Sequence, residues 1–325
     1  MRLITLDDII DIYSKTKQRG WIYLFTKFVF NHLSKTKKTF NQSTINHSNW
    51  WIIPQVRKRW NYLITGSEEL TYEEYIMRDF FGAKKDLRLL SLGSGICSHE
   101  LKLAEYSNFK EIICIDIAEK RLKEAKRIAR ERYLNNIHFV CSDILSYPFR
   151  KEYFDIVLFH SSLHHFDHIE QFLSISIKNC LKNFGQVIIN EYVGATRMQY
   201  SKTQIQEVNN ALALIPKQYR KRFKTLQLKN RFYGSGIIRM KLADPSECVD
   251  SKSILPSLHT HFTTIVEKPY GGNILMNVLK DISHHFIELN TTKEKILNNL
   301  FLFEDNYLKS NSSDFVFGIY EKRDL

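Results

Sequence analysis

The sequence predicts an α/β fold in which a mainly parallel β-sheet is covered by helices. Between residues 87 and 191, short apolar runs alternate with helical patterns, an order typical of strand–helix–strand units. Several of the apolar runs end in glycines or carboxylates, and parallel sheets bind ligands at the carboxyl ends of their strands. The length of 325 residues is enough for one large domain with additions, or for two domains.

The stretch over residues 87–101 begins this alternation. An apolar run over residues 87–92 predicts a buried strand, Gly93-Ser94-Gly95 interrupts it, and a helix is predicted over residues 98–106. A strand, a glycine turn and a helix form the first half of a nucleotide-binding βαβ unit, because glycine lets the backbone approach a ligand where a Cβ atom would collide. Asp116 ends the second predicted strand, where a carboxylate can accept hydrogen bonds from both hydroxyls of a ribose.

The remaining elements continue the pattern. Further strands are predicted over residues 137–144, 153–160, 184–191, 263–270 and 314–321. Further helices are predicted over residues 119–134, 169–181, 273–286 and 293–308. Gly185 is expected to end the helix before the fifth strand as a left-handed cap. Two acids fall at carboxyl ends of these strands, Asp143 and Glu191.

This succession resembles the class I S-adenosyl-L-methionine (SAM) dependent methyltransferases. The resemblance implies a Rossmann-like seven-stranded sheet with the order 3-2-1-4-5-7-6 and an antiparallel strand 7. It also implies SAM as the cofactor and S-adenosyl-L-homocysteine (SAH) as the product. By resemblance, Gly93 and Gly95 accommodate the methionine moiety, Asp116 binds the ribose, Asp143 meets the adenine amino group, and Ile144 packs on the adenine ring. The other residues assigned to the cofactor site are Leu92, Ser94, Ile117 and His160.

Two positions depart from the family pattern. Ser91 stands where an acid often precedes the first glycine, and Cys97 stands where a third small residue is usual. A nicotinamide-dependent dehydrogenase is the alternative that shares the first two elements, but it predicts a third glycine where this chain has Ser98 and leaves Asp143 without a task.

The segments outside the minimal fold define the expected domain organisation. Residues 1–86 are predicted as a helical N-terminal cap, residues 87–192 as the SAM-binding core, residues 193–262 as a helical substrate lid inserted between strands 5 and 6, and residues 263–325 as the end of the core. Inside the lid, helices are expected over residues 199–214 and 217–228, and Asp244-Pro245 is expected to start another. The motifs at residues 190–194, 244–247 and 270–272 resemble a bacterial subgroup linked to polysaccharide or secondary-metabolite methylation.

The chemistry of methyl transfer to a hydroxyl requires a group that takes the proton from the acceptor. His165, Glu191 and His164 are the candidates, because they follow the fourth and fifth strands at the ligand edge of the sheet. No metal is expected. His160, His164 and His168 have a spacing that one helix face could bring together, but His160 ends a strand, so the helical register starts later.

The predicted function is O-methylation of a hydroxyl on a sugar, glycan or small metabolite in the cytoplasm. The chain carries a formal net charge of +12, concentrated in residues 1–60 and 217–231, so an anionic acceptor or nucleic acid would be attracted. An RNA methyltransferase and a non-catalytic SAM-binding module are therefore the alternatives. Residues 21–30 combine aromatic side chains with basic flanks, which leaves peripheral membrane contact open, while no apolar run reaches the ~20 residues of a membrane span.

Overall fold

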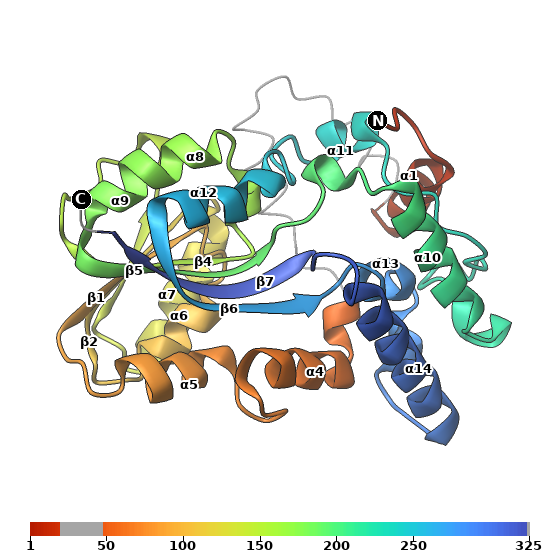
Figure 1. Ribbon diagram of the computed structural model, residues 1–325, viewed down its shortest axis with the longest axis horizontal. Helices are drawn as coiled ribbons and strands as arrows, with labels where there is room; N and C mark the ends of the chain where they lie inside the picture. Colours follow the sequence, from red (N-terminus) through yellow and green to blue (C-terminus); the bar gives the residue numbers. More distant parts are fainter. Residues whose placement is uncertain (20–47, 324–325) are drawn as a thin grey trace.

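The computed structural model describes residues 1–19 and 48–323, and this part of the chain forms a seven-stranded sheet with helices around it (Figure 1). The strand order is β3-β2-β1-β4-β5-β7-β6. Strand β7 is antiparallel to β5 and β6, and the other neighbouring pairs are parallel. The strands are β1 (Leu87–Leu92), β2 (Phe109–Asp116), β3 (Ile137–Cys141), β4 (Phe154–His160), β5 (Leu181–Tyr192), β6 (Phe262–Gly271) and β7 (Phe315–Lys322). The fold implied by the resemblance is confirmed.

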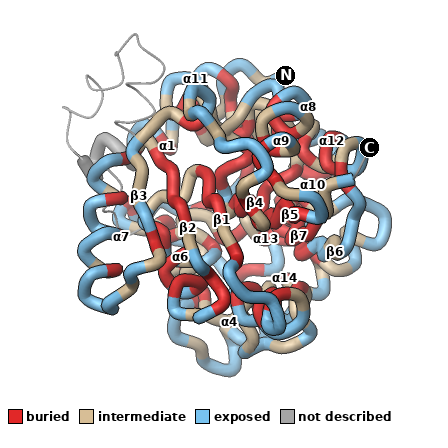
Figure 2. Tube along the Cα trace, turned by 90° about the vertical axis from the view of Figure 1, so that its left-hand side faces the viewer, coloured by how far each residue is buried: buried red, intermediate tan, exposed pale blue. Residues whose placement is uncertain are grey.

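The central strands of the sheet are buried on both faces because most of their side chains are apolar, as in β1 and β4. In β1, Leu87 and Leu89 belong to one core cluster, whereas Leu90 and Leu92 belong to the cluster on the opposite face. Figure 2 shows buried strands in the centre and largely exposed helices at the periphery. The apolar runs of the sequence therefore form the middle layer of three.

The helices lie on the two faces of this layer. One face is covered by α5 (Tyr72–Ile76), α6 (Ser98–Leu103) and α7 (Glu119–Glu131), and the other by α8 (Ile169–Gln171), α9 (Lys178–Cys180) and α12 (Ile254–His261) (Figure 1). A π-helical turn at Phe172–Ile177 joins α8 to α9.

A helical lobe packs beside the sheet around a third apolar cluster. It contains α4 (Pro54–Thr65), α10 (Lys202–Ala213), α13 (Leu275–Leu279) and α14 (Thr291–Leu308), and α1 (Leu6–Arg19) and α11 (Ile237–Ala243) lie at its upper edge in Figure 1. Helix α4 begins at Pro54, which is favourable because a proline at the first helical position loses no hydrogen bond. Thr71 and Glu74 form a capping box at the start of α5.

Three local expectations are wrong. The left-handed residue is Phe184, with φ of 58°, which lies inside β5, and not Gly185. Residues 217–228 form a short 3₁₀ turn at Lys217–Arg220 and a bridge from Lys221 to Leu228 instead of a helix. Asp244-Pro245 starts a turn, because the Asp244 carboxylate accepts hydrogen bonds from the backbone N–H and hydroxyl of Ser246, at 2.9 and 2.7 Å.

The aromatic stretch over residues 21–30 lies outside the described residues. Among the helices that are described, none has the length and apolar character needed to cross a bilayer.

Candidate active site

The glycine turn after β1 is tightly built. Gly93 has φ of 72°, and a Cβ atom placed on it would lie 2.6 Å from the Cβ of Ser162, so both backbone conformation and space require glycine. The Gly95 N–H donates to Asp116 Oδ2 at 2.8 Å, and the Ala118 N–H donates to Oδ1 at 2.7 Å. Asp116 thereby holds the turn against the end of β2.

The two predicted adenosine-binding acids lie at one edge of the sheet. Asp116 pairs with Cys141 across β2 and β3, and Asp143 follows two residues later. Asp143 accepts a hydrogen bond from the Leu145 N–H at 3.1 Å, and Ile144 beside it is buried. Each carboxylate oxygen has two lone pairs, so both acids keep acceptor capacity for hydroxyl or amino groups. The residues present therefore fit the adenosine of SAM.

Ser91, where the family often has an acid, contacts a carboxylate of α6. Ser91 donates its hydroxyl hydrogen to Glu100 Oε1 of α6 at 2.5 Å, and the two side chains are almost fully buried. Burial raises the pKa of Glu100. Cys97, the second departure, is buried with φ of 55° directly before α6. In the sequence, the only indication of Glu100 was Ser91, a small polar residue at a position where the family often has an acid.

His160 lies at the end of β4 in a stack of rings. Its ring centroid is 3.6 Å from that of His99 and 5.5 Å from that of Tyr72, whose hydroxyl is 3.1 Å from His160 Nδ1. Burial, and to a lesser degree the charge of His99, lower the pKa of His160. Burial by itself would raise the pKa of Glu73. His99 at 2.7 Å and Lys102 at 3.3 Å outweigh burial and lower the Glu73 pKa to about 2.

Glu191 and His164 form a buried pair. Glu191 is fully buried on β5, and its Oε1 accepts hydrogen bonds from the backbone N–H groups of Ser162 and Leu163. Its Oε2 is 2.7 Å from His164 Nδ1. Burial disfavours the charged imidazole, but the Glu191 carboxylate outweighs it and raises the pKa of His164. Glu191 is thus a group that orients His164, and its own oxygens are directed at these three donors.

His165 belongs to the same turn but has different partners. Its Nδ1 is 3.1 Å from the hydroxyl of Ser246 and 4.0 Å from Asp244 Oδ2. Burial and the neighbouring His164 lower the pKa of His165. The structure brings all three predicted catalytic residues, His164, His165 and Glu191, into one cluster.

Glu247 is a member of this cluster that the sequence reasoning missed. Its carboxylate oxygens are 3.9 Å from His164 Nε2 and 3.9 Å from His165 Nε2. His164, His165 and Glu247 form the one group of three metal-binding side chains with ligand atoms within 4.8 Å of one another in the described part of the chain. The only signal for Glu247 was its place in the Asp244–Glu247 motif, which had been assigned to a helix start.

A pocket of ≈ 1000 Å³ opens beside this cluster. Its wall includes His99, His160 and Ser161 as well as His164 and Glu247 of the cluster. Much of the rest is aromatic and comes mainly from the N-terminal extension, with contributions from β5, β6 and β7: Trp50, Trp51, Trp60, Tyr72, Tyr192, Tyr270 and Phe315. The wall also contains Arg57, Lys58 and Lys102 together with the carboxylates Glu68, Glu69 and Glu73, and Lys58 and Lys102 are ion-paired to Glu69 at 2.6 Å and Glu73 at 3.3 Å. The pocket is an acceptor-sized space next to the predicted base.

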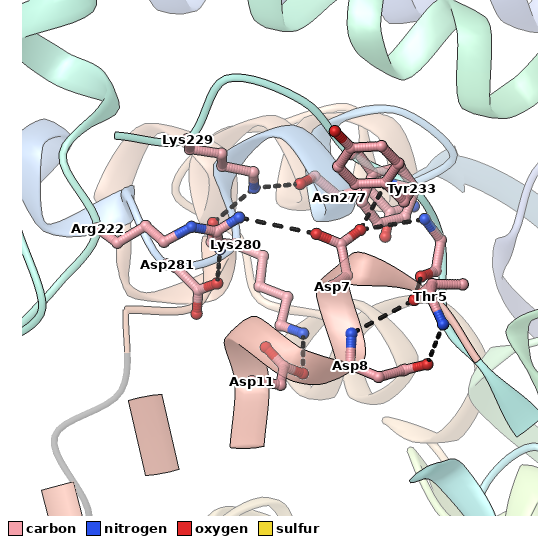
Figure 3. Close-up of polar contacts among 12 residues, drawn as sticks. Thr5, Asp7, Asp8, Asp11, Arg222, Lys229, Tyr233, Asn277, Lys280 and Asp281 are labelled. Carbon is pink, nitrogen blue, oxygen red and sulfur yellow. Dashed lines mark hydrogen bonds and ion pairs between the residues drawn. The ribbon is translucent and has the colours of Figure 1, made fainter. Parts of the chain in front are cut away.

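The basic segment over residues 217–231 is partly internal. Arg222 and Lys229 are only 4% and 2% exposed. Arg222 is 2.6 Å from Asp281 and 3.8 Å from Asp7, and the Lys229 ammonium donates to backbone carbonyls including that of Asn277 at 2.6 Å (Figure 3). Two of the seven Lys and Arg residues in this segment therefore hold the insertion to the rest of the lobe.

The comparisons with known proteins agree with this geometry. The model of a methyltransferase domain family matches residues 83–263. No curated protein matches the sequence. The geranyl diphosphate C-methyltransferase from Streptomyces coelicolor A3(2), solved with Mg2+, geranyl diphosphate and SAH, is similar in structure, with a TM-score of 0.52 and 13% identity over 91% of this chain and 99% of that chain.

A second solved structure with a similar fold is phosphoethanolamine N-methyltransferase 2 from Haemonchus contortus, in complex with SAM. Its TM-score is 0.48, with 15% identity over 89% of this chain and 60% of that chain. The family model spans more than half of the chain. The chain therefore belongs to the methyltransferase domain family, whose cofactor is S-adenosyl-L-methionine.

Proposed function

We propose that this methyltransferase methylates a hydroxyl group of a small metabolite or sugar-sized acceptor. The carrying observation is that one pocket joins the cofactor edge of the sheet, at His160 and Ser161, to the buried His164–Glu191 pair. SAM supplies the methyl group when it is bound. An alcohol acceptor must also lose its proton, and an imidazole oriented by a carboxylate is suited to take it.

The roles of the predicted site residues follow from their contacts. His164 is the proposed proton acceptor, because its Nδ1 faces Glu191 and the ring also lines the pocket. Glu191 is proposed as a positioning residue rather than the base, since it is fully buried. His165 adjoins His164 and contacts the loop that carries Glu247. For the cofactor we propose the glycine turn of Leu92, Gly93, Ser94 and Gly95, the acids Asp116 and Asp143 with their neighbours Ile117 and Ile144, and His160.

The walls of the pocket support an acceptor of modest size. Aromatic side chains give apolar faces with a few polar groups at defined places, which is the usual composition of small-molecule sites. Lys58 and Lys102 are already paired with Glu69 and Glu73 of the same wall, so its charges do not select an acceptor that carries negative charge. The volume of ≈ 1000 Å³ is at the upper end of such sites, which fits a glycoside or a similar metabolite better than an RNA helix.

The test is transfer of tritiated methyl from SAM to a panel of sugars, glycosides, phenols and bulk RNA, with the product position determined by NMR. We expect a methyl ether from a small-molecule acceptor and a loss of turnover in His164→Ala. His138→Ala changes an exposed histidine on β3 and serves as the matched control. Methylation of nitrogen or carbon, or of RNA alone, would refute the O-methyltransferase proposal.

The non-catalytic alternative has a separate test. A SAM-binding module without activity would bind SAH in a calorimetric titration and transfer methyl to none of the acceptors. We favour the enzyme, because a fully buried carboxylate costs free energy unless it is well paired, and here three donors including His164 are directed at it.

A further inference from the structure

Three metal-ligating atoms face one another on the wall of the acceptor pocket. They are His164 Nε2, His165 Nε2 and the Glu247 carboxylate, and the distance from each imidazole nitrogen to the nearer carboxylate oxygen is 3.9 Å. Two ligands about 2.1 Å from one tetrahedral ion lie about 3.4 Å apart. Small rotations of the side chains would therefore bring the three donors to coordination distance.

The far side of each imidazole is held by an oxygen. His164 Nδ1 lies 2.7 Å from Glu191 Oε2, and His165 Nδ1 lies 3.1 Å from the Ser246 hydroxyl. The Ser246 hydroxyl in turn donates to Asp244 Oδ1 at 2.7 Å. Metal-binding histidines nearly always have such partners, which fix the tautomer and aim the other nitrogen at the ion.

The loop that carries Glu247 is fastened to the histidine turn. The Arg197 guanidinium donates to the backbone carbonyls of Pro245 at 2.6 Å and Glu247 at 3.2 Å. The Val249 N–H donates to the His164 carbonyl at 3.2 Å. These bonds hold in place two segments that are more than eighty residues apart in the sequence, as a preorganised ligand set requires.

The tautomer leaves two acceptors facing each other. An ionised Glu191 only accepts hydrogen bonds, so His164 Nδ1 carries the hydrogen, and Nε2 of the neutral ring presents a lone pair toward Glu247. A separation of 3.9 Å is too long for a direct hydrogen bond, even if the ring carries a second proton. A cation between them would satisfy both groups, together with His165.

We propose that His164, His165 and Glu247 bind a divalent transition-metal ion with an open coordination position toward the acceptor pocket. Two imidazoles and one carboxylate suit Zn2+, Fe2+, Co2+ or Ni2+, whereas Mg2+ and Ca2+ prefer sets made of oxygen alone. His164 and Glu247 line the pocket, so an oxygen atom of the acceptor is the natural further ligand. This proposal departs from the sequence-based expectation that no metal is bound.

The metal site deepens the proposed function, and its role in catalysis rests on that function. A metal-bound His164 cannot also take the proton of the acceptor. A bound ion would instead lower the pKa of the acceptor hydroxyl that it holds, as it does for bound water, and the hydroxyl proton would pass to solvent water. Binding of the ion itself needs neither SAM nor an acceptor, and so it can be measured independently.

The experiment is titration of chelator-treated full-length protein with Zn2+, Co2+ and Mg2+, each alone, by calorimetry and, for Co2+, by visible absorption. We expect one tightly bound Zn2+ or Co2+ per chain, Co2+ absorption bands of a low-coordinate site, and weak or no binding of Mg2+. His165→Ala and Glu247→Gln should each weaken Zn2+ binding about ten-fold or more, and His138→Ala should leave it unchanged.

Fold and cofactor binding are followed in parallel by circular dichroism and SAH calorimetry. Glu247 has a partly exposed side chain, so Glu247→Gln is the variant expected to keep the native spectrum and SAH affinity while losing the ion. Absence of saturable Zn2+ and Co2+ binding in the native protein would overturn the proposal. Equal affinity in native protein and in both ligand variants would also overturn it, since that result means an adventitious ion only. Either outcome leaves the methyl-transfer assays unaffected, so the two proposals fail separately.

Discussion

Replacing Glu191 by glutamine tests how the pocket is organised with minimal change in shape. The carboxylate of Glu191 faces three donors, the N–H groups of Ser162 and Leu163 and His164 Nδ1. A glutamine that keeps its carbonyl oxygen toward the backbone presents its NH2 group to Nδ1. His164 must then switch tautomer, and the hydrogen moves to Nε2, which faces the pocket.

The magnitude follows from the bonds that change. A hydrogen bond to a charged group contributes about 1.5–3 kcal/mol, roughly twice a neutral one. The two backbone bonds survive in weaker form and the bond to His164 is reversed, so we expect a loss of about 2 kcal/mol in the free energy of unfolding. Turnover should fall by about 10²–10⁴-fold, the usual range for loss of general base catalysis.

Three measurements check this prediction. Urea unfolding gives the stability, initial rates give turnover, and a ¹⁵N NMR spectrum of the histidine rings identifies the tautomer of His164. Glu152→Gln, at an exposed position, is the matched control. An unchanged His164 tautomer together with native turnover would refute the assignment of Glu191 as the residue that orients the ring.

Four further predictions concern the cofactor site and the fold. Asp116→Ala should weaken SAH binding by about 1–3 kcal/mol in calorimetry, through lost charged hydrogen bonds, and an unchanged dissociation constant would contradict the ribose assignment. Gly93→Ala should lower the free energy of unfolding by about 1–3 kcal/mol, because the new Cβ meets Ser162 and φ is positive; native stability in urea would be the contrary result. Burial raises the pKa of Asp314 to about 6, so the folded state binds this proton more tightly than the unfolded state, and its contribution to stability is lost as pH rises from about 4 to 6. Asp314→Asn should accordingly gain stability relative to the native protein over that range, by about 3 kcal/mol at pH 7, and parallel stability curves would argue against it. Arg222→Met removes the cation paired with Asp281 and Asp7, of which Asp7 keeps the N–H groups of Tyr233 and Gly234, and should cost about 3 kcal/mol in urea unfolding, an effect that a solvated surface cation would not produce.

The sheet could be predicted from the sequence because its strands are continuous apolar runs that end in glycine or acid. Gly93, Asp116 and Asp143 mark the cofactor edge of the sheet. Each directly follows or ends a strand, so it can be located from the sequence alone. The strand order itself came from the family resemblance and not from periodicity.

Only part of the active-site cluster could be predicted from the sequence, and the reason is physical. His164, His165 and Glu191 follow strands and could be found there, whereas Glu247 joins them through a loop whose position depends on tertiary contacts. Asp244-Pro245 has the composition of a helix start, but the Asp244 side chain is bonded to Ser246 in a turn. The local propensity of Asp244-Pro245 to start a helix is therefore overridden by a loop geometry that tertiary contacts stabilise.

The prediction of a helix over residues 217–228 is wrong for a related reason. Its charges suggested a surface that attracts anions, yet Arg222 and Lys229 are directed inward to partners on distant segments. Nothing in the local pattern shows that a cation has a buried carboxylate or carbonyl partner. The same burial removes part of the basic surface on which the RNA alternative depended.

The acids at the start of α1 have a practical consequence for following this enzyme in solution. Asp8 and Asp11 lie within 2.7 and 3.1 Å of Arg239 of the insertion, and Asp11 also lies 3.0 Å from Lys280 after α13. The beginning of the chain is thus clamped to the segment that delivers Glu247 to the pocket. A fluorophore placed at the exposed Leu3 would therefore report on displacements of that segment during turnover, and not on the independent motion of a loose chain end.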